Sequence, residues 1–229
     1  MKERGIIFSA PMITALRRET SPKTQTRRVA KFKTDPGLNL SFTGLSVQRF
    51  GETWSLFSRG AGSCWEDRSK PLRSPYGLEG DRLWVRETHQ FDAPVDGTWP
   101  ATQFYGCKGA PLDLIPERFR HPNYCLYRAS WLHGPITWRP AIHMPRWASR
   151  ILLEITDVRI ERLNSISDAD AIAEGIEPID EGWRDYMDPS GLCIKPRTSY
   201  QTLWDSINGA ASHKTNPWIW AVSFKEIQP

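Results

Sequence analysis

The 229-residue sequence lacks the features that define several protein classes. Its four cysteines, Cys64, Cys107, Cys125 and Cys193, are widely spaced and form no C-x-x-C pair, so a zinc site is not expected. It has no apolar run of membrane-spanning length and no segment near its first residue that resembles a signal peptide. We therefore expect a cytoplasmic protein with free thiols, no membrane contact, no metal and no cofactor.

The composition is that of an ordinary globular protein. Hydrophobic residues make up 39% and charged residues 24% of the chain, which predicts a folded chain. We expect one domain over residues 1–229. The 11 tryptophans and 18 prolines favour rigid loops around aromatic surfaces. Core filling is the preferred interpretation of any single tryptophan, but several together can line a surface that stacks on bases.

Positive charge is concentrated near the start of the chain. The formal net charge is only +4, but seven cations stand within residues 17–33, where Glu19 is the only acid. They are Arg17, Arg18, Lys23, Arg27, Arg28, Lys31 and Lys33. This cluster is either a solvated basic face or a contact surface for phosphates.

Alternating apolar residues predict short strands and leave little room for helices. Strands are expected at residues 5–8, 82–87, 124–129, 150–163 and 217–227. The last four are expected to share one strongly curved sheet. In the longest, the apolar positions change face near Thr156 and Asp157, which is typical of a bulge.

Helices are expected at three places. Ser9 offers an N-cap before a helix from Pro11 to about Arg18, and Ser167 offers one before a short helix that ends at Glu174 and Gly175. A further helix is expected at residues 200–207.

The remaining long segments lack a sustained pattern. We interpret residues 31–79 and 89–122 as insertions, the first with a hairpin around Gly51, and residues 176–199 as a loop insertion.

Four segments in this order resemble the ASCH superfamily, a PUA-related group of small β-barrels. They are residues 23–28 (KTQTRR), 80–83 (GDRL), 153–158 (LEITDV) and 173–175 (AEG). The first resembles the signature Gly-Arg-Lys-Thr-x-Thr-x-Arg, with Ser-Pro in place of Gly-Arg. The chain also looks like a long form common among phage and prophage proteins. The resemblance implies an α+β fold, a curved PUA-like barrel with flanking short helices and long loop insertions.

The same resemblance implies a site. Some small members hydrolyse the acyl amide of an acetylated cytidine, and their lysine, threonine and glutamate align with Lys23, Thr26 and Glu174. A threonine hydroxyl needs a base such as a deprotonated lysine to become a nucleophile, and a glutamate can protonate the leaving amine or hold the base edge. Lys23 and Thr26 converge only if the backbone turns between them, because an extended strand directs them to opposite faces. Without the resemblance, the three are a surface lysine, a strand threonine and a helix-end glutamate.

Several further side chains are candidates for contact with a nucleic acid. Arginines offer paired donors to phosphate and stack on rings, Thr24 shares a strand face with Thr26, and His143 stands in a rigid segment between two prolines. The candidates are Thr24, Arg27, Arg28, Arg86, His143, Arg146 and Trp147. Ordinary salt bridges with Glu87 or Glu154 are the alternative role of the arginines.

We therefore expect a protein that binds a nucleic-acid base or a modified nucleoside, with hydrolysis of an acyl amide on a cytidine-type base as its implied chemistry. Its expected partner is RNA, single-stranded DNA or a modified nucleoside. Three alternatives stay open: a binding module without turnover, an endoribonuclease or other nuclease, and a protein-interaction role for the tryptophan-rich insertions.

Overall fold

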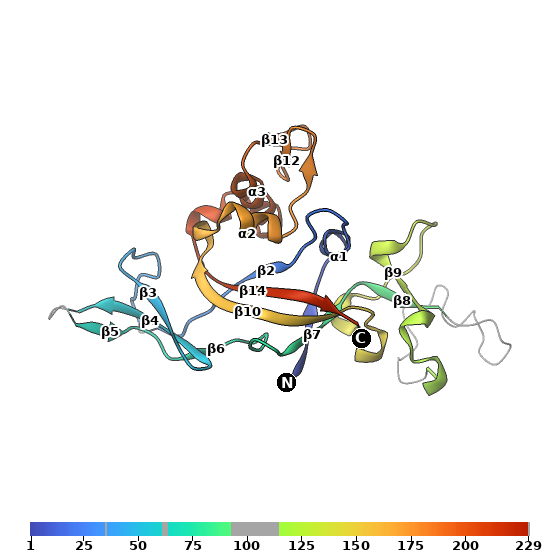
Figure 1. Cartoon of the computed structure of the whole chain (residues 1–229), viewed down its shortest axis with the longest axis horizontal. Helices are drawn as coiled ribbons and strands as arrows, with labels where there is room; N and C mark the ends of the chain where they lie inside the picture. The colour runs from blue at the N-terminus through green and yellow to red at the C-terminus, as the bar shows by residue number, and fades with distance from the viewer. Residues whose placement is uncertain (35, 61–63, 93–114, 229) are drawn as a thin grey trace. The chain divides into compact units, whose positions relative to one another are not determined.

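A computed structural model describes residues 1–34, 36–60, 64–92 and 115–228 of the chain. It has a mixed α+β structure, which confirms the expected class (Figure 1). The residues cluster into two compact units. Unit 1 comprises residues 1–17, 81–154 and 226–229, and unit 2 comprises residues 18–80 and 155–225. The expectation of a single domain over residues 1–229 stays a prediction.

Unit 1 is organised around β1 (Glu3–Ile7), which pairs in parallel with β7 (Arg82–Arg86). β7 also pairs antiparallel with the start of β10 (Leu152–Arg162). The expected helix is α1 (Ala10–Leu16). Its N-cap is Ser9, but the serine side chain makes no capping hydrogen bond.

A second sheet of unit 1 consists of β8 (His89–Phe91) and β9 (Cys125–Tyr127). β9 was expected over residues 124–129 within the large curved sheet, and that prediction was wrong: β9 pairs with β8, and a 3-10 turn follows it at once. The expected insertion at 89–122 is therefore partly β-structure, and its residues 93–114 lie outside the described residues. A separate core packs here, made of Phe91, Ile115, Phe119, Cys125, Tyr127, Met144 and Ala148.

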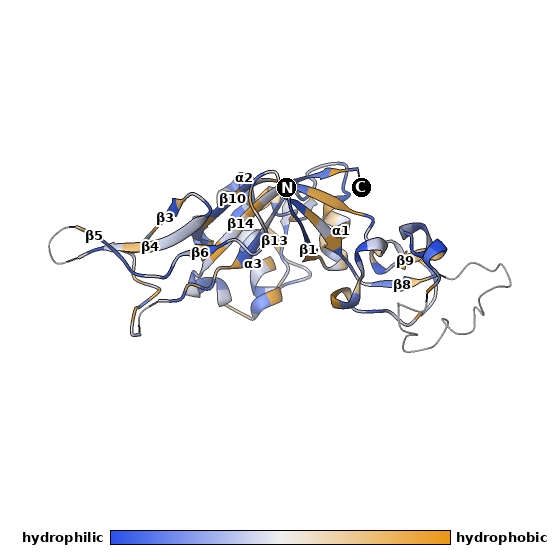
Figure 2. Ribbon diagram, turned by 90° about the horizontal axis from the view of Figure 1, so that it is seen from below, coloured by the Kyte–Doolittle hydropathy of each residue, from blue (hydrophilic) through white to orange (hydrophobic). Residues whose placement is uncertain are grey.

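Unit 2 contains β2 (Gln25–Val29), paired antiparallel with β14 (Trp218–Ile227). Both remaining helices, α2 (Asp168–Ala173) and α3 (Pro196–Asn208), lie on one side of these strands (Figure 1). Figure 2 shows α3 as mainly hydrophilic with hydrophobic stretches at intervals, and its Tyr200 and Trp204 are buried. They share a core with Leu163, Ile166, Ala171, Ile176, Ile219 and Ala221.

The segment expected as an irregular insertion at 31–79 is largely a sheet of four strands. They are β3 (Ser46–Phe50), β4 (Thr53–Arg59), β5 (Trp65–Asp67) and β6 (Leu72–Arg73). The hairpin around Gly51 is confirmed, and its glycine has a positive φ of 58°. Trp54 of β4 meets Trp220 of β14 edge to face, with ring centroids 4.9 Å apart.

Residues 176–199 also hold more structure than a loop. Three short strands form a small sheet there: β11 (Pro178–Ile179), β12 (Gly182–Arg184) and β13 (Leu192–Cys193). The strands are too short for a sequence alternation to reveal them. Short 3-10 turns complete the described elements at Glu117–Phe119, Pro122–Tyr124, Arg128–Ser130, Ala141–His143, Arg146–Ala148, Leu163–Ser165 and Ser212–Thr215.

The strand order of the largest sheet is β1-β7-β10-β14-β2. β10 passes through both units, and its buried side chains change from Leu153 and Ile155 to Val158 and Ile160, the change of face that the sequence predicted. Across the described ranges the sheets do not close into a barrel. None of the helices described is long and apolar enough to cross a membrane.

Candidate functional site

Lys23 and Glu174 meet in the interior of unit 2. Lys23 Nζ donates to Glu174 Oε2 and to the Glu174 carbonyl oxygen, both at 2.7 Å. The two side chains are only 2% and 5% exposed. The structure thus joins two residues that the family resemblance placed in one site.

Local structure explains how the pair forms. Ser167 caps α2 by accepting from Asp170 N at 3.0 Å, and Glu174 ends that helix before Gly175, whose φ is 83°. The chain before β2 is tied to this helix end because Thr24 N donates to Ala173 O at 2.8 Å. Lys23 is therefore held directly against the last turn of α2.

Thr26 does not join this pair. Gln25 and Arg27 share a hydrogen bond and hence one face of β2, so the side chain of Thr26 between them points to the other face. Its partner in register is Val222. Within the described residues no hydrogen bond links Thr26 to Lys23 or Glu174, and the backbone turn that convergence required is absent from the strand.

Arg27 lies beside the pair and is committed to internal contacts. Its side chain is 0% exposed, and its guanidinium lies 2.7 Å from Glu161, 3.3 Å from Glu174 and 3.5 Å from Asp170. The ring of Tyr200 lies 5.7 Å from it. This guanidinium therefore cannot reach a phosphate without giving up buried carboxylates, which is costly.

Burial dominates the electrostatics of the pair. It lowers the pKa of Lys23, an effect that the nearby Glu174 carboxylate opposes. Burial also raises the pKa of Tyr200 well above its usual value. Lys23 is thus an ammonium that loses its proton more readily than a lysine in water, next to an acid that holds it in place.

The other unit 2 candidates are Thr24, which directly precedes β2, and Arg28, which lies within it. Thr24 is exposed, and its backbone is bonded to Ala173 and Phe224. Arg28 is half-buried and pairs in register with Trp220. It lies close enough to Tyr76 to influence the pKa of that phenol.

The remaining candidates belong to unit 1. Arg86 Nη2 donates to Ile142 O, next to the exposed His143. Arg146 Nε donates to Glu3 at 3.0 Å. Trp147 is half-buried and packs edge to face on Phe91 in the core, so it fills space instead of offering a free stacking surface.

The sequence analysis missed His89 and Arg139, which pair through their backbones. His89 is 1% exposed, and its buried Nε2 has no hydrogen-bond partner within residues 1–34, 36–60, 64–92 and 115–228. Only the fold reveals that Arg139 meets His89.

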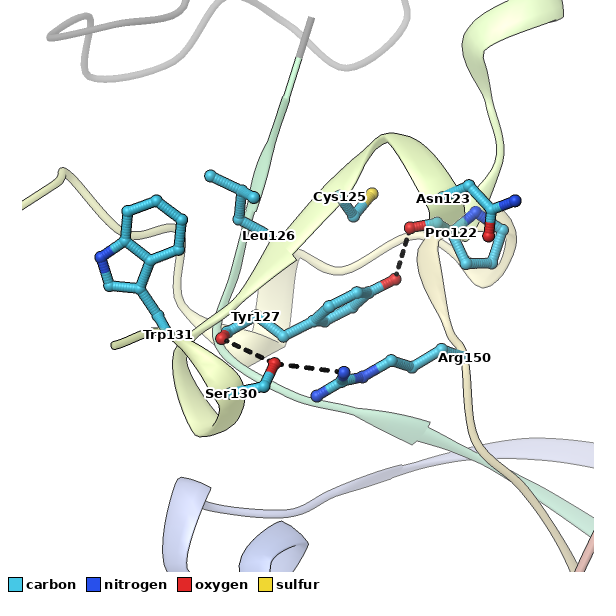
Figure 3. A pocket seen from close by; sticks show the side chains of 8 residues that line it. All are labelled: Pro122, Asn123, Cys125, Leu126, Tyr127, Ser130, Trp131 and Arg150. Carbon is cyan, nitrogen blue, oxygen red and sulfur yellow. Dashed lines mark hydrogen bonds between the residues drawn. The ribbon is translucent and has the colours of Figure 1, made fainter. Parts of the chain in front are cut away.

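Unit 1 also contains an open pocket of about 340 Å³ (Figure 3). Its lining residues are Pro122, Asn123, Cys125, Leu126, Tyr127, Ser130, Trp131 and Arg150. In Figure 3 the Tyr127 ring lies over Arg150, 3.9 Å from guanidinium carbon to ring centroid, and Trp131 stands apart at one end. Glu87 holds Arg150 through two bonds of 2.9 and 3.0 Å. Burial raises the pKa of Cys125 to about 12, so this thiol is not a nucleophile at neutral pH.

No family model, curated protein or solved structure matches the chain. The functional argument therefore rests on the residues and on the geometry of the two units.

Proposed function

We propose that the protein binds a nucleobase, in RNA, in single-stranded DNA or as a modified nucleoside, on an ASCH-type, PUA-like fold, and that Lys23 and Glu174 read the base edge. One observation carries this proposal: the two residues stand 151 positions apart and form a buried ion pair at 2.7 Å. The resemblance to ASCH proteins requires them to meet, and composition alone gives no reason for it.

The pair offers the donors and acceptors that a cytosine-type edge needs. A lysine ammonium has three N–H donors, two of which point at Glu174, so a third is left for a base carbonyl. A carboxylate accepts from the exocyclic amine of cytosine. A base entering this site replaces internal hydrogen bonds with equivalent ones, which limits the cost of desolvating the pair.

Hydrolysis of an acyl amide is the second candidate, and the lowered pKa of Lys23 favours it because a deprotonated lysine can act as a base. The direction of Thr26 weighs against it. Binding without turnover is therefore the function that this geometry supports best.

Binding can be tested by titrating cytidine, N4-acetylcytidine and uridine into the protein and following NMR chemical shifts. The variants are Lys23→Met and Glu174→Gln, and Lys31→Met is the matched control because Lys31 is exposed. We expect cytidine affinity to fall about tenfold or more in the first two, since one charge-assisted hydrogen bond contributes about 1.5–3 kcal/mol. Unchanged affinity in both, with folding verified by circular dichroism, would contradict the proposal.

Turnover and polymer binding are separated by two further measurements. Mass spectrometry of N4-acetylcytidine after incubation tests hydrolysis, which Thr26→Ala should abolish while leaving binding nearly intact. The affinity for a single-stranded oligonucleotide should fall as salt increases. In a plot of log affinity against log salt concentration, each phosphate contact contributes about −0.7 to the slope, so about four contacts give a slope near −3. An affinity independent of salt, with efficient turnover, identifies a free nucleoside as the substrate.

A further inference from the structure

Three basic side chains of unit 1, those of Arg86, Arg139 and His143, lie around the buried His89. This residue opens β8, and its backbone pairs with Arg139 through bonds of 3.2 and 2.8 Å. Arg86 ends β7 and donates from Nη2 to Ile142 O, which places it at the short turn Ala141–His143. Pro140 O accepts from His143 N at 3.0 Å, so the turn that carries the exposed imidazole is itself fixed.

Among the residues that the structure describes, two buried polar atoms of this cluster find no hydrogen-bond partner: His89 Nε2 and Arg86 Nε. His89 Nδ1 lies 3.3 Å from the carbonyl oxygen of Glu87. Because a carbonyl only accepts, Nδ1 carries the hydrogen, and Nε2 is the open position of a neutral ring. Buried polar atoms without partners are rare and costly, and they mark places where a bound molecule completes the structure.

The charges around His89 are positive. Burial first, and then the positive charges of Arg139, Arg86 and His143, lower the pKa of His89 to about 4. The nearest acid in sequence, Glu87, points its carboxylate at Arg150 instead and holds it by two bonds. The Glu87 carboxylate is therefore committed to Arg150, and an anion beside His89 would meet the positive charge of Arg86.

We propose that Arg86, His89, Arg139 and His143 form a binding site for a tetrahedral oxyanion such as a phosphate group, and that His89 takes up a proton when the anion binds. Protonation turns Nε2 from an open acceptor into a donor, so the imidazolium and the Arg86 Nε–H both point to the anion. The exposed His143 lies on the solvent side of the cluster, and the buried His89 forms its inner side. The site does not depend on base binding by unit 2.

Sulfate is the best first probe because, unlike phosphate, it does not titrate near neutral pH. Imidazole nitrogen NMR at pH 7.5 and pH 5.5, with increasing sulfate, reads the protonation of His89 directly in the wild-type protein. We expect sulfate to shift the His89 signal toward the imidazolium form and to bind about tenfold more tightly at pH 5.5, within the limit of about tenfold per pH unit that linkage to one proton allows. An imidazole spectrum that sulfate leaves unchanged at both pH values would overturn the proposal.

Variants locate the anion. His143→Ala is expected to weaken sulfate binding about threefold to tenfold, and His89→Gln is expected to remove the proton uptake. His133→Ala is the matched control, because this histidine of unit 1 is also exposed but packs on Trp131, with ring centroids 5.0 Å apart. Equal effects of His143→Ala and His133→Ala would count against the site.

Two phosphate sources can then be compared. Cytidine 5′-monophosphate supplies a terminal phosphate, and a single-stranded oligonucleotide with a 5′-hydroxyl supplies only phosphodiesters. The ligand that shifts the His89 signal at the lower concentration identifies the source. Lys23→Met should leave sulfate binding unchanged, so failure of this proposal is distinguishable from failure of the base site.

Discussion

Lys23 in unit 2 and His89 in unit 1 are buried basic groups with opposite electrostatic surroundings. In unit 2, Lys23 and Arg27 are each within 3.5 Å of a carboxylate, and Glu174 serves both. In unit 1, the buried His89 has basic neighbours, and its Nε2 has no partner in the described part of the chain. A buried ion pair that loses one partner becomes strongly destabilising, whereas the surroundings of His89 are those that we propose to accept an anion. The difference shows that the cation-rich segment 17–33 is not one uniform surface, because two of its charges are used inside the fold.

The largest expected loss of stability comes from removing one partner of the buried ion pair in unit 2. Glu174→Ala leaves Lys23 and Arg27 buried with a missing partner and should lower the free energy of unfolding by roughly 3–5 kcal/mol. Glu87→Ala is the matched change in unit 1, and it should cost only about 2 kcal/mol, because the side chain of its partner Arg150 is 18% exposed and can reach water. Urea unfolding of both variants measures the difference. Equal losses would show that the two ion pairs are not distinguished by burial.

The next effect is the pH dependence of stability that the buried His89 of unit 1 should cause. The pKa of His89 is about 4 in the folded protein and about 6.5 in the unfolded chain. Between these values the unfolded chain binds a proton that the folded chain does not, so the free energy of unfolding should fall as pH drops from 6.5 to 4. The full loss is roughly 3 kcal/mol, and none is expected above pH 6.5.

This pH dependence is isolated by comparing the wild type with His89→Gln in urea unfolding at several pH values. The carboxylates titrate in both proteins, so only the difference between the two curves reports His89. Parallel curves from pH 6.5 to 4 would contradict the assignment of a neutral, buried imidazole.

The smallest expected losses of stability come from alanine substitutions at two glycines, one in each unit. A Cβ added to Gly5 of β1 would lie 2.9 Å from Arg86 Cδ and 2.9 Å from a ring carbon of Trp84, so Gly5→Ala should cost about 1–3 kcal/mol as overpacking and should displace Arg86. Gly51→Ala in unit 2 meets no atom within 4 Å but has a φ of 58°, which costs about 1 kcal/mol. Thermal unfolding ranks the two. In addition, only Gly5→Ala should weaken sulfate binding.

The sequence predicted those parts of the fold that local chemistry determines. Alternation identified β7, β10 and β14, and the serine at 167 marked the start of α2. The strand β9 was assigned to the wrong sheet, and the small sheet at residues 176–199 was not predicted. Strands of two or three residues are too short to show an alternation, and their formation depends on the strands with which they pair.

The candidate site was predictable only in part, for a similar reason. The pairing of Lys23 with Glu174 came from the resemblance, but the direction of Thr26 depends on where β2 begins, which sequence patterns locate poorly. His89 and Arg139 meet through an isolated backbone bridge between residues 50 positions apart, and nothing in either local sequence indicates such a contact.

The ion pair of unit 2 also limits how early unit 2 can fold during synthesis. Lys23 leaves the ribosome long before Glu174, and at about 5–20 residues per second the intervening 151 residues take roughly 8–30 s to synthesise. During that interval the lysine has no carboxylate of α2 to pair with, so it must stay hydrated and the first part of unit 2 cannot close around it. The nascent chain should therefore remain open until its last third has been translated.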